Sequence, residues 1–324
     1  MGEFDLIAHY FKRPVRRAAL GVGDDCALLA PTFGMRLAVS SDMLVQGRHF
    51  FADVDPRTLG HKALAVNLSD LAACGAQPLA FTLALALPSV DEPWLRDFAA
   101  GMFALADAHG CELVGGDTTK GPLNICITVF GEVAPAQALL RSGAQAGDDI
   151  YVSGTLGDAR LGLEALQGRL SLPAATLAAA RQRLESPSPR VALGMALRGI
   201  ATSAIDVSDG LLGDLQHIAD ASSCGARIDA SITSTLIAAH ALWAGASSPF
   251  DTDLLRQCTL AGGDDYELCF TAPAHARAAV QAAAAAADTP VHRIGSITTG
   301  TGVVVHDAQG AILDTQLASF DHFA

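Results

Sequence analysis

Charged and aromatic side chains are both scarce in this chain of 324 residues. Only 17% of the residues are charged and 6% are aromatic, whereas 50% are hydrophobic. Basic residues are the scarcer sign, since 21 lysines and arginines face 34 aspartates and glutamates, for a net charge of −13. Proteins that bind nucleic acid or anionic membranes usually show the opposite balance, so we expect neither partner. The composition also excludes a disordered or collagen-like chain.

A long hydrophobic run, a secretion signal and paired cysteines are also missing. The longest uncharged stretch, 71–90, has an apolar core of only Leu79–Leu87, far short of the ~20 residues that span a bilayer. The first ten residues include Glu3 and Asp5 and show no basic-then-apolar signal pattern, so we expect a cytoplasmic protein. The seven cysteines form no C-x-x-C pair, which favours reduced thiols over a disulfide framework or a zinc site.

Several familiar catalytic motifs are absent as well. The chain contains no G-x-x-x-x-G-K-[ST] phosphate loop and no H-R-D or D-F-G kinase signature. The segment Asp206–Gly210 differs from a calcium loop, because its glycine comes one position early and the terminal glutamate is missing. Neither a P-loop enzyme nor a protein kinase is therefore expected.

What the chain does contain is an alternation of β-like and helical segments, which predicts a two-domain α+β (α/β) fold. Turn-forming residues around 134–147 place a boundary that divides the chain into residues 1–137 and 138–324. Asp55 and Pro56 predict the start of a helix over Arg57–Cys74, which ends at Gly75. The other expected helices lie at Glu92–His109, in two Ala/Leu-rich segments before Ser186, from Leu211 and over His275–Ala287. Strands are expected at Met35–Ser41, Phe81–Leu87, Glu112–Val114, Asn124–Val133, Asp149–Ser153, Ser203–Val207 and Glu267–Thr271.

Acidic residues recur beside glycines and at the ends of these predicted strands. The positions are Gly23–Asp25, Ser40–Asp42, Asn67 with Asp70, Gly115–Asp117, Asp206–Gly210 and Gly262–Asp265. One such site alone would be an ordinary turn or helix cap. As a set they lie where α/β folds bind ligands, at the ends of apolar strands.

Converging acids require a counter-charge. Two carboxylates ~4 Å apart cost each other about 4 kcal/mol at an effective dielectric near 20. Such a cluster binds cations or protons. Oxygen ligands without histidine or cysteine favour Mg²⁺, with nucleotide phosphates completing its coordination.

Taken in order, these motifs resemble the thiamine-monophosphate kinase family, within the superfamily of aminoimidazole-ribonucleotide synthetase and selenophosphate synthetase. The segments that carry the resemblance span nearly the whole chain: Gly21–Leu29, Ser40–Phe50, Lys62–Gly75, Gly115–Gly121, Leu140–Gly147, Ile205–Leu211 and Gly262–Leu268. The resemblance implies an N-terminal ATP- and Mg-binding domain that dimerises through its sheet. It implies a C-terminal α/β sandwich that completes the active site.

The same resemblance implies roles for individual residues. Several Mg²⁺ ions would be held by Asp25, Ser40, Ser41, Asp42, Asp70, Asp117, Asp206 and Asp209. ATP would contact Gly116, Asp117, Arg141 and Ser208, and thiamine monophosphate would contact His49, Asp264 and Phe320. Asp264 departs from the family, which usually has glutamate in Gly-Gly-Glu-Asp. Lys62 is interpreted as a surface helix residue and is left out of the site.

The implied reaction moves the γ-phosphoryl group of ATP onto the phosphate of thiamine monophosphate. A phosphate monoester is already anionic at pH 7, so we expect no general base among the catalytic residues. Two alternatives stay open: another ATP-dependent enzyme of the superfamily, and a non-catalytic protein that binds Mg-nucleotide.

Overall fold

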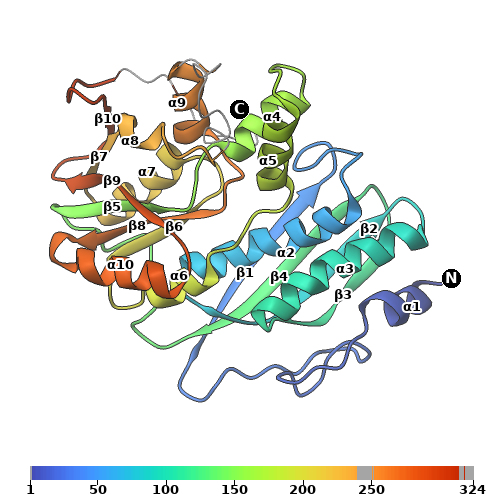
Figure 1. Cartoon of the computed structure of the whole chain (residues 1–324). Helices are drawn as coiled ribbons and strands as arrows, with labels where there is room; N and C mark the ends of the chain where they lie inside the picture. The colour runs from blue at the N-terminus through green and yellow to red at the C-terminus, as the bar shows by residue number, and fades with distance from the viewer. Residues whose placement is uncertain (1, 239–249, 251, 314–316, 318–324) are drawn as a thin grey trace. The chain divides into compact units, whose positions relative to one another are not determined.

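The computed structural model of the chain describes residues 2–238, 250, 252–313 and 317 (Figure 1). It consists of two compact units. The first comprises residues 1–71 and 76–138, and the second comprises residues 72–75 and 139–324. Both combine helices with a sheet, which confirms the predicted α+β class.

The first unit contains one four-stranded sheet and two long helices. Its elements are α1 (Glu3–Leu6), β1 (Arg36–Val45), α2 (Pro56–Ala73), β2 (Gln77–Leu87), α3 (Glu92–His109), β3 (Glu112–Lys120) and β4 (Asn124–Val133). The strand order is β1-β4-β2-β3, so β1 and β3 are the edges. Only β2 and β3 run parallel, and the other two pairs are antiparallel.

Helices α2 and α3 run side by side along this sheet (Figure 1). Their backbones touch at two glycines, since a Cβ on Gly60 would collide with the carbonyl oxygen of Phe98, and one on Gly101 with that of Arg57. Phe81 and Phe98 are fully buried in the resulting core. The close helix contact therefore depends on glycine at both positions.

The ends of both helices follow the predicted signals. Oδ1 of Asp55 accepts hydrogen bonds from the backbone N–H groups of Arg57 (2.7 Å) and Thr58 (3.3 Å), which caps α2. Helix α3 ends at Gly110, whose φ of 60° lies in the left-handed region. The predicted helix over Glu92–His109 is confirmed at both ends.

The second unit is built on a six-stranded sheet. Its strands are β5 (Asp148–Ser153), β6 (Ser203–Val207), β7 (Gly225–Asp229), β8 (Glu267–Pro273), β9 (Val291–Thr298) and β10 (Gly302–His306). Its helices are α4 (Asp158–Leu166), α5 (Ala174–Glu185), α6 (Val191–Ala196), α7 (Leu211–Ser222), α8 (Ala230–Thr233), α9 (Thr252–Ala261) and α10 (Arg277–Ala286). The order is β10-β7-β9-β5-β8-β6, antiparallel except for β10 with β7.

Helix α7 anchors the core of this unit. Leu211, Leu215 and Ile218 recur at helical spacing and are fully buried against the sheet strands, including Ile150 of β5 and Ile205 of β6. This packing fixes the start of α7 directly after β6, where the acidic segment Asp206–Asp209 lies.

Two further features bear on the earlier expectations. Among the described residues, no helix is both long and apolar enough to cross a membrane. All seven cysteines are free thiols; only Cys26 is exposed, and the others are buried or half-buried.

Candidate functional site

Three polar side chains and the backbone of Asp42 meet in the first unit between β1 and α2. The hydroxyl of Ser40 donates a short hydrogen bond to Oδ2 of Asp70. The backbone N–H of Asp42 donates to Oδ1 of Asn67 over 3.0 Å, and the Asn67 amide donates in turn to the carbonyl of Ala63. We call Ser40, Asp42, Asn67 and Asp70 the β1–α2 cluster.

The β1–α2 cluster has the chemistry of a hard-cation site. Ser40 and Asp42 lie two residues apart, so both side chains are on the same face of β1. Asn67 is buried, while the other three members are half-buried. The cluster offers carboxylate, amide and hydroxyl oxygens without sulfur or imidazole, which is the donor set that Mg²⁺ prefers. The predicted residues Ser40, Asp42 and Asp70 are thus brought together.

Ser41 lies on the opposite face of the sheet. Its hydroxyl is hydrogen-bonded to the hydroxyl of Thr128 (2.9 Å) and to the carbonyl of Ile127 (3.2 Å) on β4. Successive side chains of a strand point to opposite faces, so the Ser41 hydroxyl cannot join Ser40 and Asp42. The Ser41 side chain thus lies apart from those of Ser40 and Asp42, and its metal role stays a prediction.

Asp117 is also separated from the β1–α2 cluster. It is exposed on β3, paired in register with Ala84 of β2, at the opposite edge of the sheet from β1. Three strand spacings amount to about 14 Å. Gly116 beside it has a φ of 143° and lies against the backbone of Leu83, where a Cβ would collide, so this position requires glycine.

His49 and Lys62 meet near the end of β1. Nδ1 of His49 accepts a hydrogen bond from the backbone N–H of Val45 (2.9 Å), so a neutral His49 ring carries its proton on Nε2. Nζ of Lys62 donates to the carbonyl oxygen of His49 over 3.4 Å. Lys62 is only 3% exposed, which corrects its interpretation as a surface residue. Its position beside the apolar residues 63–66 of α2 was the sequence signal that could have indicated a buried lysine.

Asp25 stands apart from these groups. It is exposed in the loop that precedes β1, and its backbone N–H donates to Oδ1 of Asp24 over 2.9 Å. In the described part of that loop, no hydrogen bond joins Asp25 to another predicted metal ligand. Its metal role stays a prediction.

In the second unit, the segment Asp206–Gly210 joins β6 to α7. Asp206 is buried, whereas Ser208 and Asp209 are half-buried. The segment is held by Asp214, whose Oδ2 accepts the backbone N–H groups of three consecutive residues, Ser208, Asp209 and Gly210. Burial, and then the charge of Asp209, raises the pKa of Asp214 to about 7. Asp214 is not among the residues that the sequence motifs predict for the site.

Asp264 lies directly against this segment. Its backbone N–H donates to the carbonyl of Ser208, and that of Tyr266 donates to the carbonyl of Val207, each over 2.8 Å. Asp264 and Tyr266 have φ values of 66° and 51°, in the left-handed region. A bulky residue such as Tyr266 rarely adopts that conformation, and such strain occurs preferentially at functional sites. The predicted substrate contact Asp264 and the predicted ATP contact Ser208 are neighbours.

Two buried acids fix the start of β8 behind Asp264. Oδ2 of Asp265 accepts the backbone N–H of Gly157 over 2.7 Å, and burial raises the pKa of Asp265 well above its usual range. Glu267 is fully buried and forms ion pairs with Arg183 (2.8 Å) and Arg190 (2.5 Å). These contacts hold the backbone that carries Asp264.

Arg141 and Phe320 complete the predicted set. Arg141 is exposed, and its carbonyl accepts the hydroxyl of Ser222 at the far end of α7 (3.2 Å). Since α7 has 12 residues, its length of about 18 Å separates this anchor from Ser208. Phe320 lies outside the described residues. Within the described part of the chain, no three His, Cys, Asp or Glu side chains are grouped closely enough to hold a metal ion.

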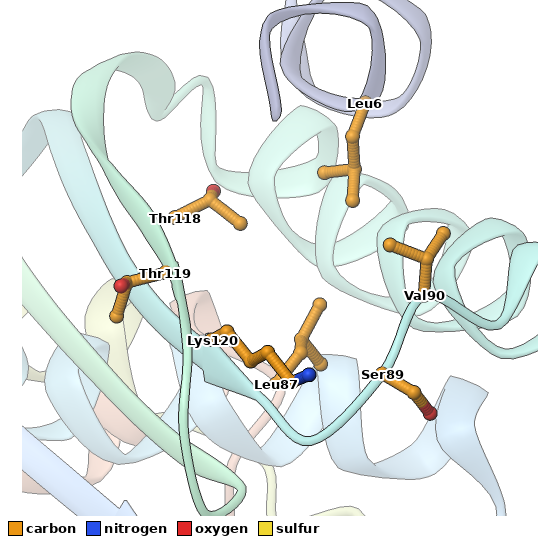
Figure 2. Close-up of a pocket in the computed structure, with 7 residues that line it drawn as sticks. All are labelled: Leu6, Leu87, Ser89, Val90, Thr118, Thr119 and Lys120. Atoms are coloured by element: carbon orange, nitrogen blue, oxygen red, sulfur yellow. The ribbon is translucent and has the colours of Figure 1, made fainter. Parts of the chain in front are cut away.

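The first unit also has a pocket of about 560 Å³ at the β3 edge (Figure 2). Its lining combines apolar side chains with hydroxyls and one ammonium group: Leu6, Leu87, Ser89, Val90, Thr118, Thr119 and Lys120. Among the described residues, no predicted site residue lines it. Because β1 is at the other edge of the sheet, this pocket is separate from the β1–α2 cluster.

Comparison with known proteins identifies the family. The AIR synthase related protein N-terminal domain matches residues 23–133, and the C-terminal domain of the same family matches residues 145–308. The thiamine-monophosphate kinase of Salmonella typhimurium (strain LT2) is 47% identical over 328 residues, covering 100% of this chain and 98% of the relative. That of Haemophilus influenzae is 39% identical over 331 residues, with the same coverage.

Solved structures agree. Thiamine-monophosphate kinase from Stenotrophomonas maltophilia K279a has a TM-score of 0.82 at 48% identity, covering 93% of this chain and 94% of that one. AaThiL complexed with AMPPCP and TMP has a TM-score of 0.75 at 27% identity, covering 91% and 89%. The chain therefore belongs to the AIR synthase related proteins and, among them, to the thiamine-monophosphate kinase family.

Proposed function

We propose that this chain phosphorylates thiamine monophosphate to thiamine diphosphate, with ATP as the donor and Mg²⁺ as the metal. The observation that carries the proposal is the 47% identity with a thiamine-monophosphate kinase over the full length of the chain. Oxygen donor groups at the motif positions of the β1–α2 cluster support it. The AaThiL structure, which contains AMPPCP and TMP, supports the same pair of substrates. A reaction that consumes ATP also suits the cytoplasmic location that the sequence analysis expects.

The predicted site residues fall into metal-binding, structural and substrate-orienting groups. Ser40, Asp42 and Asp70 of the first unit, and Asp206 and Asp209 of the second, are the side chains that would hold Mg²⁺. Held by these side chains, Mg²⁺ would neutralise charge on the phosphoryl oxygens. Asn67 holds β1 at a fixed distance from α2, and His49 with Asp264 would orient thiamine monophosphate. The acceptor phosphate is already anionic, so catalysis depends on orientation and electrostatics, without a general base.

The free face of the first sheet supports a homodimer. Leu37, Val39 and Met43 of β1 are 45%, 59% and 53% exposed, and all three lie on the face that α2 and α3 leave uncovered. Apolar side chains in such a row are typical of an interface. The other apolar strands contribute less to this face, because Phe81, Leu83 and Leu85 of β2 and Ile125, Ile127 and Val129 of β4 are already buried inside the unit. Strand β1 carries the exposed surface instead.

A dimer through this face also gives Ser41 and Asp117 a role. Both lie on the uncovered face or its edge and away from the β1–α2 cluster of their own chain. As ligands they would serve a site to which a second copy contributes. This would account for the separation of Asp117 from the β1–α2 cluster within the first unit.

The test is direct conversion of thiamine monophosphate. Purified protein with ATP and Mg²⁺ should form thiamine diphosphate and ADP in equal amounts, followed by chromatography and ³¹P NMR. Asp70→Asn preserves the shape of the side chain and removes its charge, so it should lose most activity while keeping the wild-type melting temperature. Binding of Mg-ATP without any diphosphate product would favour the non-catalytic alternative. Near-normal turnover by Asp70→Asn at saturating Mg²⁺ would remove Asp70 from the metal site.

A further inference from the structure

Three consecutive backbone N–H groups at the start of α7 converge on one carboxylate oxygen. Ser208, Asp209 and Gly210 donate to Oδ2 of Asp214 over 3.1, 3.2 and 3.1 Å. Asp214 lies in the first turn of α7 and is only 4% exposed. All three donors are therefore satisfied from within the same helix.

This arrangement of donors is one that proteins commonly use to bind phosphate. The first N–H groups of a helix point outward with the positive end of its dipole, and successive N–H groups in a loop form an anion-binding concavity. In this chain the carboxylate of Asp214 takes the place of the phosphate. The loop that joins β6 to α7 is thus closed to an external anion.

The closure changes what the segment offers to a ligand. Its side chains contribute the carboxylates of Asp206 and Asp209 and the hydroxyl of Ser208, all of them oxygen groups. The Ser208 carbonyl is fixed by the backbone N–H of Asp264 (2.8 Å), which holds the segment in one conformation. Oxygen ligands on a fixed loop select cations, and a phosphate could approach them only together with a metal ion.

We propose that Asp214 is a positioning residue that closes the start of α7 to phosphate and so makes Asp206–Asp209 a cation-binding segment. The inference rests on the proposed function, because it concerns how that segment meets Mg-bound nucleotide. An ordinary helix cap would contribute stability only. Asp214 in this role also determines which ligands the segment accepts.

The test compares Asp214→Ala with Asp220→Asn, a control at an exposed acid on the same helix whose carboxylate accepts Gln216. In Asp214→Ala, the Mg²⁺ concentration for half-maximal rate should rise about 10–100-fold, as when other supports of metal ligands are removed. With EDTA present, calorimetric titration with inorganic phosphate should show an affinity about tenfold above wild type, because the N–H groups are released. Asp220→Asn should change neither quantity.

A folded Asp214→Ala protein with wild-type Mg²⁺ dependence and wild-type phosphate affinity would overturn the proposal. Should that variant fail to fold, Asp214→Asn decides, because it keeps one acceptor oxygen and loses the negative charge that strengthens the three hydrogen bonds. The Mg²⁺ concentration that this variant needs for half-maximal rate should rise at least about threefold, with an unchanged melting temperature. An unchanged Mg²⁺ requirement would overturn the proposal. The phosphate titration needs no turnover. A wild-type protein without kinase activity would therefore count against the proposed function and still leave Asp214 testable.

Discussion

At Asp264, backbone conformation and side-chain identity are linked. Its φ of 66° is one that aspartate and asparagine adopt more readily than most residues. The family usually has glutamate here, and the shorter side chain relieves part of the backbone strain while drawing the carboxylate back by about one C–C bond. A water-mediated hydrogen bond can bridge such a gap at little cost.

We therefore expect Asp264→Ala to raise the KM for thiamine monophosphate and leave the KM for ATP almost unchanged. Asp264→Glu should bind the substrate at least as well as wild type and lose up to about 1 kcal/mol of stability to the left-handed backbone. Asp264→Asn keeps the backbone preference and removes the charge, so it serves as the control. Steady-state kinetics for both substrates and urea unfolding decide the matter. If Asp264→Ala instead raised the KM for ATP or the Mg²⁺ requirement and left the KM for thiamine monophosphate unchanged, Asp264 would be assigned to the metal site.

Asp149 makes the second unit sensitive to acid. Hydrogen bonds from Arg277 first, and also from Arg293, hold the pKa of the Asp149 carboxyl below its usual value despite its burial. Because the folded-state pKa is lowered, this stabilisation is present above the unfolded pKa near 4 and is lost as pH falls through the folded value.

Asp149→Asn should lower the free energy of unfolding at pH 7 by about 1–2 kcal/mol, since both arginines are half exposed to water. The difference from wild type should shrink as the pH is lowered toward 2.5, where the wild-type carboxyl is also neutral. Urea unfolding across that range measures it. Asp253→Asn, which removes an exposed carboxylate 3.4 Å from Arg256, is the matched control and should have almost no effect. A constant difference at all pH values would show that Asp149 contributes shape and not charge.

Among the elements, β1 has two roles on its two faces. Ser40 and Asp42 face α2, while Leu37, Val39 and Met43 face away from it. Burying the second face against another copy would leave the first face unchanged. The strand therefore permits association to be altered without touching the β1–α2 cluster.

Val39→Lys should weaken the dimer roughly 100-fold or more, because a charge would be buried among apolar side chains without a partner. Sedimentation velocity at micromolar concentration should show twice the 33.3 kDa chain mass for wild type and the single mass for the variant. Val304→Lys, at a hydrophobic position 36% exposed in the second unit, should remain dimeric. A wild-type protein that sediments only as a monomer would contradict the interface.

Elements with local signals were predictable from sequence, and elements stabilised by distant neighbours were not. Helix α3 carries its own cap, apolar periodicity and terminal glycine, and both of its ends were correct. Strand β3 was expected to end at Val114, but it continues to Lys120, because Gly115 and Gly116 extend along β2 past an irregular register. Strands β7 and β10 are short and lack alternation. Strand β10 pairs with β7, and β7 pairs in addition with β9, so both depend on strands distant in sequence.

Over the whole molecule, the net charge of −13 means that bound cations should stabilise the folded chain. A ligand that binds only the folded state adds about 2.7 kcal/mol at 100 times its Kd, which corresponds to a rise in melting temperature of about 4 °C or more. We expect this rise with ATP and Mg²⁺ together and little of it with ATP and EDTA. Asp70→Asn should reduce the rise. An equal shift in EDTA would show that ATP binds without the metal.

The types of residue in the site were predictable from sequence, but their grouping was not. Motif order predicted metal roles for Asp42, Asp70 and Asp209, which stay predictions. The side-chain period of two would already have separated Ser41 from its neighbours. Asp214 could not be identified in this way, because an aspartate in the first turn of a helix is common. Its importance follows only from the three N–H groups that the fold directs to it.

The distribution of thiols has a practical consequence for labelling. Burial raises the pKa of Cys111 and Cys258 to about 12, so these thiols resist alkylation at neutral pH. Exposed Cys26 should react first with a maleimide, which would place a fluorophore or spin label one residue from Asp25. Cys126 lies on the uncovered sheet face beside Ser41, so its alkylation rate would report whether a second copy covers that face. The native chain thus carries two reporters, one for the loop of Asp25 and one for association.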